Sequence, residues 1–142
     1  MPSWEDLASQ SHYQTAVAVR DALGRGDAAS ANEGIEELIE ALSRSERRAL
    51  KSQLVRLMVH VIKWHTQPLQ RSRSWVATIQ NSRDEVFDIM QETPSLNRAT
   101  VDQLWPACLQ QATRQAEAEM DAPAATGTLT WQQVMADECR LP

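Results

Sequence analysis

Hydrophobic residues recur along most of the chain at intervals of three and four positions, the spacing of one face of an α-helix. Sustained alternation of hydrophobic and polar residues, which would indicate half-buried β-strands, does not occur in the sequence. Strong helix formers dominate between the few glycines and prolines, which are helix breakers. We therefore predict an all-α protein, folded as a compact bundle of four to five helices.

The first two helices are predicted from about residue 7 to residue 23 and from about residue 31 to residue 42. The first should stop at Gly24 and Gly26, because glycine is the residue most often found just after a helix. The second is predicted to be amphipathic, with a hydrophobic face formed by Ile35, Leu38, Ile39 and Leu42.

The third helix is predicted from about residue 44 to residue 65. Ser43 followed three positions later by Glu46 has the pattern of a capping box, and Pro68 steers Gln67 out of the helical conformation. At about 100° per residue, the hydrophobic side chains of this helix cover more than about 200° of its circumference. A surface helix has a stripe of roughly 100°. This helix should therefore be the central, buried one.

A fourth helix is predicted to begin within residues 72–75 and to break at Pro94. A fifth is predicted from residues 97–100 to residue 120. It contains Pro106, which should kink the helix or mark its first turn, because proline has no N–H group to donate.

The C-terminal part is predicted to contain a linker over residues 123–130, followed by a short helix and tail over residues 131–142. Thr130 and Gln133 form a second capping-box pattern. Because so short a helix is unstable alone, it should dock on the bundle of residues 1–122, in its own chain or across a dimer. The prediction is one domain overall.

Charge is distributed in blocks along the 142-residue chain, whose formal net charge is −5. The net charge is −6 over residues 1–43, +7 over residues 44–73 and −6 over residues 74–142. An acidic average does not favour nucleic-acid binding. The two cysteines are too far apart for a zinc motif, and no apolar run could span a membrane. A cytoplasmic protein is expected.

Residues 60–75, "HVIKWHTQPLQRSRSW", combine basic and aromatic side chains at the corner between the third and fourth helices. The structural residues of this corner should be Trp64, Pro68 and Trp75. The basic candidates for binding an anion near the N-terminus of the fourth helix are Lys63, Arg71 and Arg73. In the alternative interpretation, carboxylates from the first or second helix pair with the arginines.

Catalytic and metal-binding motifs are sparse. Arg56 and His60 face the same way on the third helix and are the candidates for a helical, ribonuclease-like or other hydrolytic activity, with Arg73 as a further residue of interest. His60 and His65 lie about 140° apart around the helix, so no shared metal site is predicted. The sequence also contains no glycine-rich phosphate loop, and we expect no cofactor.

Several short motifs resemble a family found in cyanobacteria and proteobacteria that is catalogued as domain of unknown function twenty-nine. The residues that carry the resemblance are Ser45, Glu46, Arg47, His60, Lys63, Trp64, Gln67, Pro68, Arg71, Ser72, Ser74, Trp75, Pro94, Ser95 and Leu96. The resemblance implies a compact helical bundle and no particular activity. Our functional hypothesis is a non-enzymatic binding or interaction module, with a protein partner or a second copy of the chain as its partner.

Overall fold

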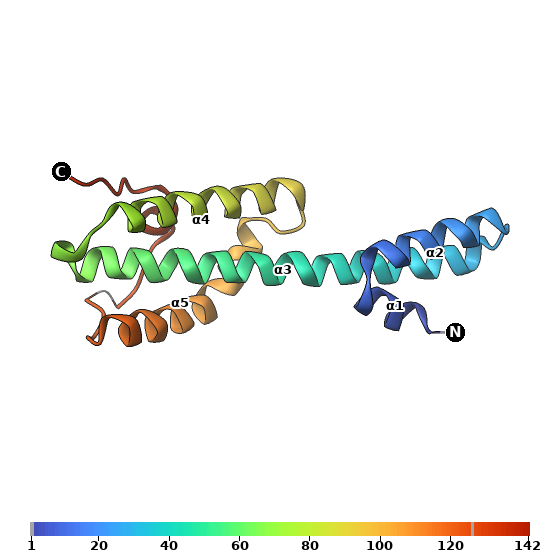
Figure 1. Ribbon diagram of the computed structural model, residues 1–142, viewed down its shortest axis with the longest axis horizontal. Coiled ribbons are helices and arrows are strands. Elements are labelled where there is room, and N and C mark those ends of the chain that lie inside the picture. The colour runs from blue at the N-terminus through green and yellow to red at the C-terminus, as the bar shows by residue number, and fades with distance from the viewer. Residues whose placement is uncertain (1, 126) are drawn as a thin grey trace. The chain divides into compact units, whose positions relative to one another are not determined.

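The computed structural model describes residues 2–125 and 127–142, and these residues contain helices and no strand (Figure 1). The all-α prediction is confirmed. The elements in chain order are α1 (Trp4–Gln10), α2 (His12–Gly24), α3 (Ala28–Thr66), a 3-10 turn (Pro68–Gln70), α4 (Arg73–Glu92), α5 (Arg98–Met120) and a π-helical turn (Gln132–Ala136). Within the described residues, no helix is both long enough and apolar enough to cross a membrane.

α3 is one uninterrupted helix where the sequence predicted two, so the predicted break between residues 42 and 44 is wrong. Ser43 lies inside the helix and caps nothing there. The physical reason is that neither glycine nor proline occurs between Gly34 and Pro68. The N–H groups that a capping box would have satisfied bond instead to carbonyls of the preceding turn.

The single helix predicted over residues 7–23 is, conversely, two helices. Ser11 separates α1 from α2 with an extended backbone, at φ −158° and ψ 115°. Its side chain accepts a hydrogen bond from the N–H of Gln14, at 3.1 Å, and so begins α2 as an N-cap. α2 ends at Gly24, and Gly26 has a left-handed φ of 76°, so the predicted glycine stop is confirmed.

The chain divides into two compact units, residues 1–47 and residues 48–142, and α3 contributes to both. We call them the N-terminal unit and the C-terminal unit. The N-terminal unit has a small core of Val19, Ala22 and Ala31, against which Trp4 packs. Gly34 allows this close approach, because a Cβ atom there would lie 2.7 Å from both the Trp4 ring and Val19. The grouping of residues 1–122 as one bundle stays a prediction.

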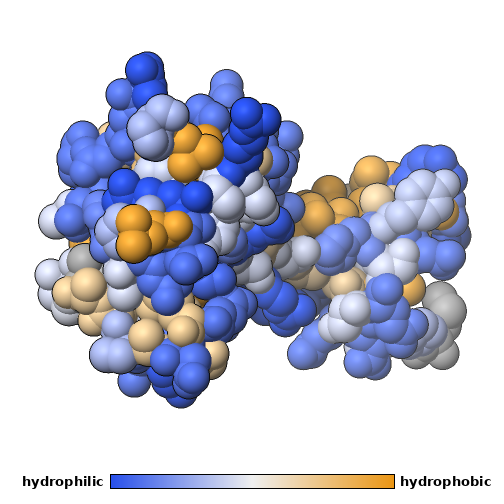
Figure 2. Space-filling model, turned by 60° about the vertical axis from the view of Figure 1, so that its left-hand side comes forward, coloured by the Kyte–Doolittle hydropathy of each residue, from blue (hydrophilic) through white to orange (hydrophobic). Residues whose placement is uncertain are grey.

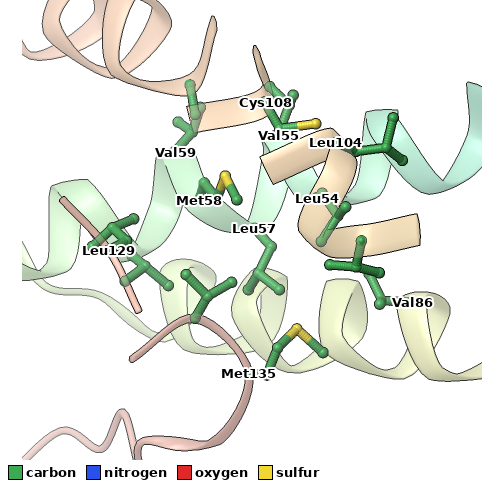
Figure 3. Packing of buried hydrophobic residues seen from close by; sticks show 14 of the residues in the cluster. Leu54, Val55, Leu57, Met58, Val59, Val86, Leu104, Cys108, Leu129 and Met135 are labelled. Atoms are coloured by element: carbon green, nitrogen blue, oxygen red, sulfur yellow. The ribbon is translucent and has the colours of Figure 1, made fainter. Parts of the chain in front are cut away.

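The C-terminal unit has a much larger core, centred on residues 50–64 of α3. Figure 3 shows Leu57 directed toward the α4 side, near Met135, whereas Val55 and Val59 lie on the α5 side with Cys108. Helix α3 is therefore covered on several sides in this region, as its wide hydrophobic arc predicts. The prediction of a central buried helix is confirmed, with longer bounds than expected.

The C-terminal segment docks on this core in its own chain. Leu129, Val134 and Met135 are buried, although Leu129 belongs to the predicted linker. The predicted capping box forms: the Thr130 hydroxyl accepts from the N–H of Gln133 at 3.2 Å, and the Gln133 side chain accepts from the N–H of Thr130 at 2.9 Å. The helical part is one short π-helical turn, Gln132–Ala136, and the tail beyond Ala136 is not helical.

α5 holds the segment from the other side. The indole N–H of Trp105 donates to the Leu129 carbonyl at 3.1 Å, and the guanidinium of Arg98 lies 3.8 Å from the centre of the Trp131 ring. α5 itself runs through Pro106 without ending there, so Pro106 does not mark the first turn.

Candidate functional site

At the corner between α3 and α4, two of the three residues predicted to bind an anion make stabilising contacts within the chain. The Lys63 ammonium pairs with the carboxylate of Glu119 on α5, at 2.5 Å, and lies 5.9 Å from the centre of the Trp75 ring. Its hydrogen bond lowers the pKa of Glu119. Because this charge already has a carboxylate partner, Lys63 is a poor candidate for holding an external anion.

Arg71 also makes its contacts within the chain. Its Nε–H donates to the Trp64 carbonyl at 2.9 Å, and its guanidinium lies 4.3 Å from the centre of the Trp64 ring. The last carbonyls of a helix lack an intrahelical donor, and Arg71 satisfies one of them at the end of α3. Arg71 thus already contacts a carbonyl and an aromatic ring, and the alternative that carboxylates from the first or second predicted helix pair with the arginines stays a prediction.

The chain turns at Pro68, which opens the 3-10 turn after Gln67. Trp64 is buried and Trp75 is half-buried against the same core. Both rings lie beside a cation of the corner, Arg71 for Trp64 and Lys63 for Trp75. The three predicted corner residues thus lie at one turn of the chain, where cation–π contacts supplement their packing.

Arg73 differs from its two neighbours. It is the first residue of α4, it is exposed, and it lines a cavity of about 650 Å³ beside that helix. The cavity has α4 on one side and the C-terminal tail on the other. Its lining residues are Arg73, Val76, Ala77, Ile79, Gln80, Arg83, Ala136, Glu138, Cys139, Arg140 and Leu141. Most of the α4 residues follow the three-and-four spacing of one helix face.

Arg83 connects the two sides of this cavity. Its guanidinium donates to the main-chain carbonyls of Val134, at 2.8 Å, and Gln133, at 3.3 Å. Neutral carbonyls orient the guanidinium and leave its positive charge uncompensated. Among residues 2–125 and 127–142, no carboxylate lies within 4 Å of the nitrogens of Arg73 or Arg83.

The remaining charges of the cavity cancel. Arg140 pairs with Glu138, the one acidic residue in the lining. The cavity therefore carries an excess of about two positive charges, from Arg73 and Arg83, next to apolar side chains such as Val76 and Leu141. Such a mixture suits a small organic anion, whose charged group meets the arginines and whose carbon skeleton meets the apolar wall.

Cys139 is a free thiol in the lining of the same cavity. Burial raises its pKa above the usual value, against the smaller opposing effect of Arg83. A raised pKa keeps sulfur in the protonated form at neutral pH, and the thiol is a much weaker nucleophile than the thiolate. The cavity therefore has the character of a binding site more than that of a cysteine-dependent active site.

The predicted catalytic pair lies elsewhere on α3. The imidazole Nδ1–H of His60 donates to the main-chain carbonyl of Arg56 at 2.8 Å, whereas the Arg56 side chain is exposed. Burial lowers the pKa of His60, so the ring is mostly neutral at pH 7 with Nε2 as its acceptor. Neither residue lines the cavity beside α4. The ribonuclease-like interpretation of Arg56 and His60 stays a prediction.

No group of three or more histidine, cysteine, aspartate or glutamate side chains is placed to hold a metal ion in the parts of the chain that the structure describes. Sequence reasoning did not identify Arg83, Gln80, Cys139 or Arg140 as site residues. The spacing of Arg73, Gln80 and Arg83 does place them on one face of α4. However, the return of the tail to that face is a tertiary contact with no local signal.

The helices define an all-α protein with an arginine-lined cavity beside α4. A family model described as "Domain of unknown function DUF29" matches residues 27–139. The match covers well over half of the chain, so the chain belongs to this family and the resemblance seen in the sequence is confirmed. Neither a curated protein nor a solved structure matches the chain significantly.

Proposed function

We propose that the protein is a non-enzymatic binding module that takes a small organic anion in the cavity between α4 and the C-terminal tail. The observation that carries the proposal is the pair of guanidinium groups, Arg73 and Arg83, that face one cavity without a carboxylate partner among the described residues. An unneutralised arginine pair at a partly apolar cavity favours a carboxylate or a phosphate monoester.

The two arginines have different roles in this proposal. Arg83 is held by two carbonyls and so presents its remaining N–H groups in a fixed direction. Arg73 is exposed and can close over the ligand from the start of α4. The volume of about 650 Å³ lies within the range of roughly 300–1,000 Å³ typical of small-molecule sites.

The proposal is tested by calorimetric titration of the full-length chain with phenyl phosphate and with inorganic phosphate, against sodium chloride at matched ionic strength. Phenyl phosphate should bind more tightly than phosphate, because its ring can cover the apolar part of the lining. Arg73→Gln should weaken binding about tenfold, the loss of one charge-assisted contact. Arg114→Gln is the control, since Arg114 is exposed on α5 and does not line the cavity.

The proposal fails if neither probe binds beyond the effect of sodium chloride, or if Arg114→Gln weakens binding as much as Arg73→Gln does. A short single-stranded oligonucleotide serves as a third probe. Tight oligonucleotide binding that is unchanged in Arg73→Gln would also contradict the proposal that the cavity is the ligand site. The basic residues of α3 would then be the candidates for the binding surface.

A further inference from the structure

The two arginines of the cavity beside α4 that have no carboxylate partner among the described residues lie far apart along the helix. An α-helix rises about 1.5 Å per residue, so Arg73 and Arg83 are separated by about 15 Å along the axis of α4. The guanidinium of Arg83 is held at its position by the carbonyls of Val134 and Gln133. The two positive charges therefore mark two separate points of the cavity.

The C-terminal tail forms the second wall of the cavity along the same stretch of α4. The carbonyl of Val134 accepts from Arg83, and the tail residues that line the cavity, 136 and 138–141, follow directly in the chain. In Figure 1 this tail runs beside the first part of α4 and ends near the beginning of that helix. The cavity is therefore elongated along α4, with Arg83 toward one end and Arg73 toward the other.

Apolar side chains line the cavity between the two arginines. They are Val76, Ala77 and Ile79 on α4, together with Leu141 of the tail. On the face of the C-terminal unit that Figure 2 draws at its left, hydrophobic side chains form small separate areas among hydrophilic ones. A ligand of this unit therefore meets apolar contacts over a short stretch and charged groups beyond it.

We propose that the ligand of this cavity is an elongated dicarboxylate, with one carboxylate at Arg73, the other at Arg83 and its hydrocarbon chain along the apolar residues between them. This inference rests on the proposed function, because it names the chemical class of the small organic anion. Guanidinium groups bind carboxylates through charge-assisted hydrogen bonds, and the hydrocarbon chain gains from leaving water.

The charges of the lining favour two separated carboxylates over one compact anion. Arg140 is paired with Glu138, so the tail adds no net charge to the cavity. An anion held at Arg73 alone would leave the charge of Arg83 uncompensated, whereas a long dianion neutralises both. Gln80 lies on the same face of α4 between the arginines and is neutral, so it adds no further charge there.

Calorimetric titration of the full-length chain with three sodium salts at matched ionic strength tests the proposal. Suberate has two carboxylates on a long chain. Octanoate has the same chain length with one carboxylate, and malonate has two carboxylates on a short chain. Suberate should bind at least about tenfold more tightly than either, because it alone reaches both arginines and covers the apolar residues between them.

An Arg73 variant tests whether the second carboxylate is bound where we propose. In Arg73→Gln the second carboxylate loses its partner, so the dissociation constants of suberate and octanoate should come within about threefold of each other. Arg73 is exposed, so the variant should keep the fold, which circular dichroism melting verifies. Arg114→Gln, on α5 and outside the lining, is the matched control and should keep the tenfold preference for suberate.

The inference is overturned if suberate binds no more tightly than octanoate, if malonate binds as tightly as suberate, or if Arg73→Gln keeps the preference for suberate. Phenyl phosphate distinguishes this failure from a failure of the proposed function. If phenyl phosphate binds in an Arg73-dependent way but suberate shows no preference, the cavity is an anion site and the dicarboxylate is wrong. If none of the four compounds binds, both proposals are wrong.

Discussion

The two units of the chain use the same helix in different ways. In the C-terminal unit, α3 belongs to a core of twenty-one buried residues, whereas in the N-terminal unit the core comprises three buried residues and Trp4. Of the seven large hydrophobic residues that are exposed among those the structure describes, five lie in the N-terminal unit. The difference shows that the hydrophobic pattern determines which faces of a helix can be buried. How many other helices and segments pack against that helix determines which of those faces are buried.

The family match sharpens this comparison. It begins at residue 27, one position before α3, so α1 and α2 lie outside it. These two helices pack closely on one face of α3, where the small residues Ala31 and Gly34 lie beside Val19, Ala22 and the Trp4 ring. The family region, by contrast, contains all the elements that surround α3 in the C-terminal unit.

The largest effect is expected in the C-terminal core. Leu57→Ala should lower the free energy of unfolding by about 2–5 kcal/mol, because it removes a fully buried side chain and leaves a cavity. Urea unfolding monitored by circular dichroism measures the loss. Ile39→Ala, on the same helix but 60% exposed, is the control and should stay within about 0.5 kcal/mol at low concentration. Equal losses would contradict the contrast between the units.

A smaller effect is expected in the N-terminal unit from Gly34→Ala. Alanine favours a helix over glycine by about 1 kcal/mol, but the new methyl group would lie 2.7 Å from the Trp4 ring and from Val19. Overpacking costs about 1–3 kcal/mol, so a net loss on the order of 1 kcal/mol is expected. Hydrogen exchange should become faster in α1 and α2 while α4 and α5 keep their protection.

Gly24→Ala is the matched control for that experiment. A Cβ atom at Gly24 meets no atom within 4 Å and its φ is not left-handed, so this variant should be neutral or slightly stabilising. Slower exchange in α1 and α2 after Gly34→Ala would show that the glycine is not needed for close packing there.

The smallest effect is a dependence on pH that belongs to the C-terminal unit. Burial lowers the pKa of His60 below 6.5, and the hydrogen bond from Lys63 lowers the pKa of Glu119 below 4.5. In each case the unfolded chain binds the proton more readily. Stability is therefore complete above about pH 6.5 and falls in two steps, as the pH drops below 6.5 and then below 4.5.

Glu119→Gln should remove the lower step and cost about 1 kcal/mol at pH 7, because Glu119 is 43% exposed although the Lys63 side chain is mostly buried. His60→Gln should remove the upper step and leave the lower one. Melting temperatures between pH 3 and pH 8 separate the two. An unchanged profile in both variants would show that other groups carry the acid sensitivity.

Sequence patterns predicted the all-α class, the central helix, the corner at Pro68, the glycine stop after α2 and the capping box at Thr130. Each of these depends on residues close together in the chain, through helical periodicity, the geometry of proline and glycine, or a local hydrogen bond. The two wrong predictions of helix boundaries, at Ser43 and at Ser11, were also based on local patterns. Ser43 has the chemistry of a cap without a helix break before it, and Ser11 interrupts a run whose hydrophobic pattern continues.

The candidate site was only partly predictable, because it depends on contacts between segments that are distant in the chain. Lys63, Arg71 and Arg73 lie within eleven positions and look equivalent in sequence, yet Glu119 and the Trp64 carbonyl occupy the first two and leave Arg73 at the cavity. Arg83 joins Arg73 only because the tail returns to α4 some fifty residues later. The sequence by itself determined which helix faces carry hydrophobic and charged groups. Only the tertiary structure decided which charges are neutralised, because that depends on contacts between segments distant in the chain.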